Sequence, residues 1–468
     1  MPNTFAFVSL FLYLIASTFI LKQNKSVISF LFIIFIGNLF LPARVEVDLP
    51  LIPPVNKHFV LSILCLIGLK VLDNQHRLRI KLDSITKIYL LIICSMIVTI
   101  STNMEPVFNG LYWIQGMTAY DIVSSAIKWL VFITPLYAGY LIHQNNSNND
   151  KLFKVIVVLA LIYSLFILIE LRLSPQFHTW VYGFFPHNFN QHIRDGGYRP
   201  VVFLGHGLVV SIYLSLAVLT SLALFLSKRG GLISRNGLII SIYLFVVLVL
   251  SKSLGAILLT LVGVVVLTFC SPKRVSKISL SITIIAVSYP LLAIFQLIPN
   301  TTIIDLANQI NPDRAISLAS RIFQEQQIIL HLNEKLMFGW GPWGRYRLIN
   351  SVTDSFWIIN IGTWGVIGFS LFMLLFVKNV IDSNRVIHNE KLKKVDFLNY
   401  SAHSLIVSLL LVDQLTNNSM NVINLYFMGA FLGRSKYFLN LQYNNQSQTL
   451  YKTMYAANKA RIIPTNKY

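Results

Sequence analysis

The chain has 468 residues, of which 55% are hydrophobic and only 12% are charged. The mean hydropathy of +0.65 is that of an integral membrane protein and excludes a water-soluble protein with a large core. Cys65, Cys94 and Cys270 all fall within apolar runs, so the sequence supports neither a disulfide framework nor a thiolate metal site.

Apolar runs suited to crossing a bilayer recur along the chain and predict an all-α polytopic membrane protein with about 13 transmembrane helices. The first run has no Lys or Arg before it, so we interpret it as a retained helix and not as a cleaved signal peptide. The predicted spans are 4–21, 27–41, 58–73, 86–102, 119–142, 153–172, 200–226, 236–250, 254–270, 278–298, 355–377, 400–416 and 419–433.

Lys and Arg concentrate in alternate connectors, which predicts an external N-terminus and a cytoplasmic C-terminus. The net charge of +20 therefore marks topology and contact with lipid headgroups, and it does not indicate nucleic acid. We expect one transmembrane domain over 1–433, with a large outer loop at 299–354 inserted. A basic, loosely ordered cytoplasmic tail should follow at 434–468.

The outer loop contains a predicted amphipathic helix. Pro312 is typical of a helix start, and the residues after it include four apolar side chains at helical spacing that should pack on the membrane domain. These are Leu318, Ile322, Ile329 and Leu332. Arg314 and Arg321 share one face, with Glu325 one turn later. The helix either carries a solvated Arg321–Glu325 pair or binds a phosphate-bearing ligand, because guanidinium matches phosphate bidentately.

The motif FGWGPWGRYR follows the helix. Its interleaved glycines, among them Gly339 and Gly341, predict a tight loop with close backbone approach and exposed N–H groups. Trp340 and Trp343 fit either sugar rings or an interfacial aromatic belt. Arg345 adds a further cation to this loop.

Asp354 stands immediately before the next predicted span. Asp is a preferred helix N-cap, so this position needs no catalytic role. A carboxylate at the mouth of an outer cavity is also where a general base for a hydroxyl would lie. Both interpretations stay open.

The segment HNFNQHIRDGGYRPVVFLGH enters another span and places Arg199 and His206 on one face just below the outer surface. Its histidines, with His178 before them, lack the spacing of a zinc motif, so no metal is expected. Lys252 lies in a tight SKS turn and either reaches the interface or adds to an anion site. Glu46 and Asp48 form a further carboxylate pair without Asp-x-Asp spacing.

Four of these motifs occur in an order that resembles the superfamily of bacterial O-antigen ligases and of O-antigen or exopolysaccharide polymerases, which are multispan enzymes of the GT-C type. They are GGYRPVVFLGHG, SKSLGA, the SR-led loop helix ending in FGWGPWG, and TDSFWIINIGTWGVIG. The resemblance covers residues 190–370, and the remainder matches in hydropathy alone. The last motif includes G-x-x-G-x-x-G at Gly362, Gly365 and Gly368.

The resemblance implies a GT-C-like fold and a glycosyltransferase that polymerises undecaprenyl-diphosphate-linked oligosaccharide repeats on the periplasmic face of the inner membrane. No cofactor is implied, and transfer is expected to be metal-independent. The partners implied are the lipid-linked glycan, membrane lipids, a flippase and a chain-length regulator. One alternative is an O-antigen ligase that transfers glycan to a lipid core. An alternative of another class is a non-enzymatic transporter of polysaccharide or lipid-linked sugar, for which internal symmetry would be expected.

By the same resemblance, Arg199 and Arg321 occupy positions where family arginines hold the diphosphate, and Arg345 is added as a third candidate. Asp354 stands where ligases usually carry a histidine, which weakens a ligase assignment, and it is the candidate base. Lys252 replaces an arginine often seen in the small-residue turn. The remaining candidate substrate-binding residues are His206, Arg314, Trp340 and Trp343.

The predicted topology can be tested by cysteine labelling. An impermeant thiol reagent should label Asn311→Cys in spheroplasts and miss Asn384→Cys, because the charge bias places the first outside and the second in the cytoplasm. Lysed membranes, in which both positions should react, provide the control. The reverse labelling pattern in intact spheroplasts would contradict the orientation.

Overall fold

The computed structural model describes most of the chain. Residues outside the description are 50–51, 77–82, 109, 111–112, 145–149, 195, 229–230, 311, 350, 352–354, 389–393 and 462–468. The described residues are mainly helical, and the strands among them are short.

Seven described helices are long and apolar enough to cross a membrane, which makes the chain an all-α membrane protein. They are α1 (Thr4–Gln23), α4 (Ser84–Ser101), α5 (Ala119–His143), α6 (Asp150–Leu173), α8 (Gly207–Ser227), α12 (Pro272–Ile294) and α15 (Phe356–His388). Shorter apolar helices lie at α2 (Val27–Phe40), α10 (Gly237–Leu250) and α11 (Leu254–Phe269). The bundle is completed by α3 (Lys57–His76), α16 (Lys394–Thr416) and α17 (Val422–Arg461). Every predicted apolar range is thus mainly helical.

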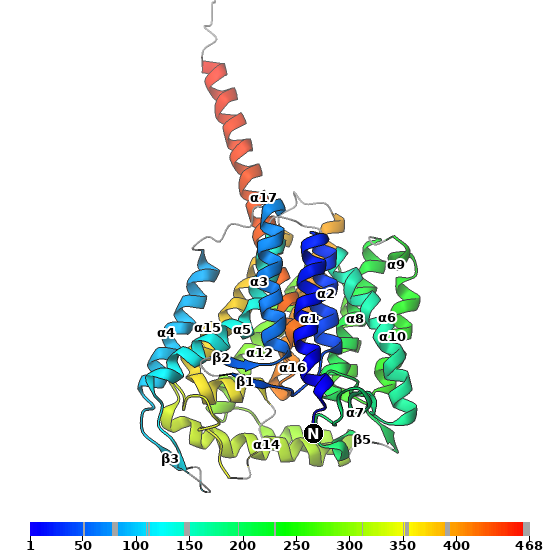
Figure 1. Cartoon of the computed structure of the whole chain (residues 1–468). Helices are drawn as coiled ribbons and strands as arrows, with labels where there is room; N and C mark the ends of the chain where they lie inside the picture. Colours follow the sequence, from blue (N-terminus) through cyan, green and yellow to red (C-terminus); the bar gives the residue numbers. More distant parts are fainter. Residues whose placement is uncertain are drawn as a thin grey trace, which may run out of the picture.

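The two ends of the bundle differ. Figure 1 shows α14 (Pro312–Leu332) lying across one end, where the N-terminus also lies, while α17 projects from the opposite end. We call the end with α14 the outer end. Helix α17 continues to Arg461, although the sequence analysis expected a loosely ordered tail after residue 433. The described tail contains neither Gly nor Pro, so nothing in it breaks the helix.

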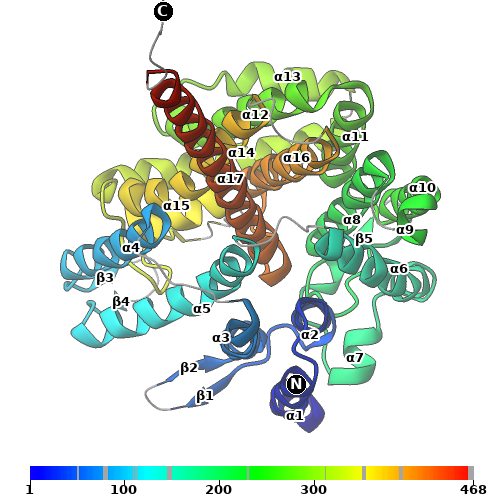
Figure 2. The ribbon, with the colours of Figure 1, turned by 90° about the horizontal axis from the view of Figure 1, so that it is seen from above.

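Seen from above, α17 passes through the middle of the bundle (Figure 2). It packs closely on α5, where a Cβ on Gly429 would lie 1.8 Å from the carbonyl oxygen of Leu136. Such small residues let two helices approach when lipid offers no hydrophobic drive between them. Helices α6, α8 and α10 form a neighbouring group, in which α8 contacts both of the others.

Short elements occupy the connectors. Three antiparallel hairpins pair β1 (Val47–Leu49) with β2 (Ile52–Val55), β3 (Val107–Phe108) with β4 (Trp113–Ile114), and β5 (Ile193–Arg194) with β6 (Gly197–Tyr198). The short helices are α7 (Phe177–Tyr182), η1 (Phe189–His192), α9 (Leu232–Arg235), α13 (Asn300–Ile310) and η2 (Asn333–Lys335). All three hairpins lie in connectors that the predicted spans, counted from an external N-terminus, would place on the outer side.

The predicted amphipathic helix is confirmed as α14, which begins at Pro312. Of the four side chains expected to pack inward, Ile329 and Leu332 are buried, and Leu318 and Ile322 are half-buried. The helical spacing therefore identified the correct face.

Residues of the outer loop form hydrogen bonds with backbone groups at a break in α15. Gly365 has φ 69° and interrupts this helix, which leaves backbone groups without intrahelical partners. The residues before and within the glycine-tryptophan loop take them over through four backbone hydrogen bonds. Their donor and acceptor atoms are Trp340 N to Gly362 O at 2.8 Å, Gly341 N to Thr363 O at 3.0 Å, Val366 N to Leu336 O at 2.9 Å, and Ile367 N to Met337 O at 3.2 Å.

This docking corrects one expectation and explains another. The N–H groups of Trp340 and Gly341 bind α15, so they are not exposed to a ligand as the sequence analysis expected. Close backbone approach holds at Gly339, where a Cβ would lie 2.5 Å from Gly365 N. At Gly341 a Cβ would meet only ordinary contacts, the nearest at 3.4 Å. Glycine is needed there for its φ of 81° and not for a close backbone approach.

Replacing Gly365 should destabilise this junction. In Gly365→Ala the Cβ would lie 2.2 Å from Met337 O at a left-handed φ, so we expect a loss of roughly 1–3 kcal/mol or more of unfolding free energy. The melting temperature of the purified protein in detergent measures this. Gly255→Ala is the matched control, because nothing lies within 4 Å of that site in α11. Equal melting temperatures for the two variants would contradict the docking.

Candidate functional site

A buried carboxylate organises the segment that carries Arg199. Glu170, near the outer end of α6, is 1% exposed. Its Oε2 accepts hydrogen bonds from Val201 N and Val202 N at 2.7 Å each, and its Oε1 accepts one from Phe177 N at 3.1 Å. These bonds hold a turn in which Val202 has φ 48°. Glu170 thereby fixes the backbone between Arg199 and α8.

Arg199 is 1% exposed and lies at the entrance of α8. Its backbone N donates to His192 O at 2.8 Å, and its Nη2 donates to Ser253 Oγ at 3.0 Å. A Cβ on Gly207 would lie 2.7 Å from the Arg199 side chain, so only glycine leaves room for this guanidinium. Arg199 and the SKS turn, which the sequence analysis treated as separate candidates, are therefore in direct contact.

Lys252 supports the same segment from the SKS turn. It has φ 55°, and its Nζ donates to Arg194 O in β5 at 2.8 Å. A Cβ on Gly197 in β6 would lie 2.6 Å from this Nζ. The ammonium thus binds the β5–β6 hairpin and brings positive charge close to the Arg199 segment.

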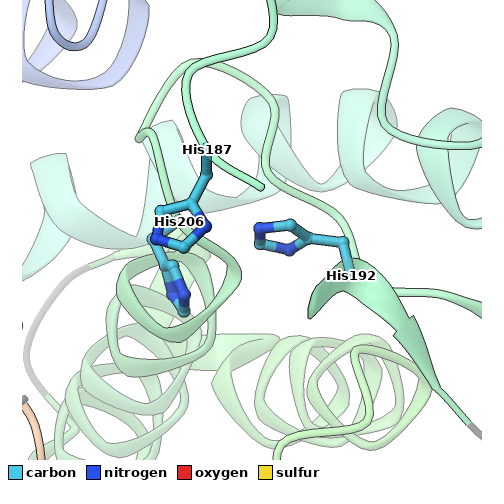
Figure 3. A group of neighbouring side chains, drawn as sticks. All are labelled: His187, His192 and His206. Atoms are coloured by element: carbon cyan, nitrogen blue, oxygen red, sulfur yellow. The ribbon is translucent and has the colours of Figure 1, made fainter. Parts of the chain in front are cut away.

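Three of the four histidines of this region come together (Figure 3). His187 lies before η1, His192 ends η1, and His206 caps α8, with one ring nitrogen of each within 4.8 Å of the others. Burial, with the charge of Arg199 added, lowers the pKa of His192 to about 4 and that of His206 to about 2, so both are neutral at pH 7. His178 lies elsewhere, with Ala43 N donating to its Nε2 at 3.2 Å.

Arg321 reaches the same end of the bundle from α14. Its Nη1 lies 3.4 Å from the carbonyl oxygen of Thr416, at the end of α16. Asp413, one turn earlier in α16, is electrostatically coupled to both Arg199 and Arg321. The charges of both arginines that the resemblance assigned to diphosphate therefore act on one buried carboxylate.

Asp413 is held in a polar network at the α16–α17 junction. It is 3% exposed, and it accepts hydrogen bonds from Asn417 Nδ2 at 2.7 Å, from Gln414 Nε2 at 3.2 Å and from the Ser419 hydroxyl. The carbonyl oxygen of Asn417 also accepts Phe356 N at 3.2 Å, which ties this junction to the start of α15. Because its oxygens are already hydrogen-bonded, Asp413 is suited to positioning its neighbours.

Arg345 binds backbone groups of the protein, although the sequence analysis named it as a candidate for binding the diphosphate. It is 0% exposed, and its guanidinium donates to the carbonyl oxygens of Trp340 at 3.0 Å, Gln115 at 2.5 Å and Glu105 at 2.7 Å. A guanidinium bound to three backbone carbonyls joins the outer loop to the 105–115 segment. This geometry favours a role in loop structure over one in ligand binding.

The two tryptophans of the loop differ in exposure. Trp340 is 6% exposed and stacks on His331 with ring centroids 4.2 Å apart, which makes it part of the loop core. Trp343 is 54% exposed, and its Nε1 donates to Asp121 Oδ1 at 3.1 Å. Lys128 Nζ lies 4.0 Å from the centroid of the Trp343 ring. Trp343 is therefore the one of the pair available to a ligand or to lipid.

Two candidate groups fall outside the description. Asp354 is not among the described residues, and the side chain of Arg314 is not described. The choice between cap and base for Asp354 therefore stays as the sequence left it. The described ion pairs do not include Arg321 with Glu325, since Glu325 Oε1 accepts instead from Tyr289 Oη at 3.2 Å.

Sequence reasoning missed Glu170, Asp413 and the histidine cluster. Glu170 is an acidic residue inside a predicted span, which is by itself a signal of function or of a buried network. Asp413 opens the polar run DQLTNNSMN between two apolar runs, a density of hydrogen-bonding side chains that exceeds what a turn needs. The histidine cluster has no local signal, because its members are separated by unequal intervals.

Comparisons with protein-family models and with curated proteins find no match to this chain.

The carboxyl group of Glu325 in α14 should titrate near neutral pH. Burial raises the pKa of this carboxyl from its usual value near 4.5 to about 7. Between these values the folded protein binds more protons than the unfolded chain, so stability should fall as pH rises through this window. Melting temperatures at pH 5.5 and pH 8 should therefore differ less in Glu325→Gln than in the wild type. The exposed Glu334→Gln is the control, and an unchanged pH slope in Glu325→Gln would contradict the assignment.

Proposed function

We propose that this chain is a glycosyltransferase that polymerises undecaprenyl-diphosphate-linked oligosaccharide repeats at the periplasmic face of a bacterial inner membrane. The observation that carries the proposal is that Arg199 and Arg321 both act electrostatically on the buried Asp413. The two arginines come from segments far apart in the sequence. Two guanidinium groups offer the bidentate donors that a diphosphate requires.

The proposed topology has thirteen membrane-crossing helices, namely α1 to α6, α8, α10 to α12 and α15 to α17. The N-terminus and α14 would then face the periplasm, and α17 would end in the cytoplasm. Two observations support this arrangement. The outer elements gather at one end in Figure 1, and the basic connectors alternate along the chain.

In the proposed reaction an acceptor sugar hydroxyl attacks the anomeric carbon of the donor glycan. A new glycosidic C–O bond forms, the bond from the anomeric carbon to the diphosphate breaks, and the lipid diphosphate leaves with the electron pair. Arg199 and Arg321 would stabilise the negative charge that develops on this leaving group. The hydroxyl proton would pass to Asp354 as general base. This step requires no metal.

Arg321 allows the proposal to be tested without disturbing the buried core, and Asp354 allows the proposed base to be tested by a substitution that keeps a helix cap. Arg321 is exposed, so Arg321→Ala should leave folding intact while polymer formation falls by about 10²–10³-fold, as on loss of one preorganised donor. Lys at this position should restore part of the activity. If Asp354 is the base, Asp354→Asn should lower turnover by about 10²–10⁴-fold, because Asn caps a helix equally well but takes no proton.

The assay uses purified protein in lipid vesicles supplied with the native lipid-linked repeat, and products are separated by length. Arg347→Ala, which removes another exposed cation of the outer loop, is the matched control and should remain active. Normal polymerisation by Arg321→Ala would remove the diphosphate role, and normal turnover by Asp354→Asn would leave that residue as a helix cap. Transfer of a single glycan to a lipid core, without chain growth, would instead indicate the ligase.

A further inference from the structure

The three-histidine cluster combines features that point to a ligand. His192 is 0% exposed, and neither of its ring nitrogens has a hydrogen-bond partner. Leaving a buried imidazole without partners costs stability, so its position next to two further imidazoles needs an explanation. Its ring points toward His187 and His206 in Figure 3. From this geometry we infer that His187, His192 and His206 bind a divalent transition-metal ion of the zinc type.

The dimensions of the cluster fit such an ion after a small movement. Ligands of tetrahedral zinc at about 2.05 Å from the metal lie about 3.3 Å from one another. The ring nitrogens here are all within 4.8 Å, so the widest gap has to close by about 1.5 Å, which side-chain rotation can supply. Three imidazole ligands suit zinc and its neighbours and not magnesium or calcium. A fourth position stays open for water or an anion.

Metal binding would change one hydrogen bond of the cluster. His206 Nδ1 now accepts Leu208 N at 3.0 Å. Ligation through Nε2 requires a proton on Nδ1, so this cap bond would be exchanged for the metal bond. One cap hydrogen bond contributes far less stability than a structural zinc site.

Arg199 is the main opposing charge, because it is electrostatically coupled to both His192 and His206. Its presence favours an anion or hydroxide as the fourth ligand. The ion would join the start of α8 to the segment 187–192, whose His192 carbonyl accepts Arg199 N. The site would therefore hold the Arg199 segment in place. It does not depend on the proposed transfer reaction and takes no part in the chemical step.

The test measures metal directly, using full-length protein purified in detergent through a tag without histidines. Elemental analysis should find about one zinc per chain. After chelation, Co²⁺ should restore about one equivalent, with the visible absorption of tetrahedral coordination. His192→Gln should reduce bound metal at least tenfold. His206→Asn should do the same while keeping a good helix cap, which separates loss of the ligand from loss of the fold.

His388→Gln is the control, because it removes an exposed histidine outside the cluster and should leave the metal content unchanged. Wild-type protein that neither contains zinc nor binds Co²⁺ would overturn the inference. So would equal metal content in the wild type and in monodisperse His192→Gln. Neither result would bear on the diphosphate arginines, which the polymer assay tests separately.

Discussion

Four backbone hydrogen bonds between residues 336–341 and the break in α15 hold the outer loop on the helix bundle. A helix broken at Gly365 leaves N–H and C=O groups that lipid cannot satisfy, and each such group costs several kcal/mol, on the order of the transfer cost of an unpaired amide. The loop supplies the missing partners and therefore has to dock at this point. Because α14 and η2 lead directly into the docked residues, this junction also places Arg321 over the end of α16.

A buried carboxylate has the corresponding role for the other half of the site. Glu170 accepts the backbone N–H groups that follow Arg199, so the chain can turn into α8 with Arg199 buried against the SKS turn. Asp413 is acted on by the charges of both Arg199 and Arg321. The hydrogen bonds to Glu170 and those at the break in α15 are formed mainly by backbone groups. Together they position Arg199 and Arg321 at one end of the molecule, where an anionic ligand would be stabilised.

The sequence predicted individual elements well where periodicity was strong. The predicted apolar ranges fall mainly in helices, and the inward face of α14 was correctly identified, because hydrophobic spacing reports directly on helix burial. Arg345 shows the limit of that reasoning. Its position in a loop rich in glycine and tryptophan suggested a ligand-binding cation, yet its guanidinium binds three carbonyl oxygens from two segments. No local pattern could indicate Gln115 and Glu105 as its partners, because they lie more than 200 residues earlier in the chain.

By itself, the sequence determined that this is a helical membrane protein and where its long polar insert lies in the chain. These properties depend on composition and on the spacing of residues that lie close together in the sequence. Only the tertiary structure decided that Arg199 and Arg321 both act electrostatically on Asp413, that the glycine-tryptophan loop satisfies backbone groups at the break in α15, and that His187, His192 and His206 meet. The physical reason is that each of these arrangements depends on groups brought together by helix packing and by the satisfaction of buried polar atoms. Neither is encoded in the spacing of neighbouring residues.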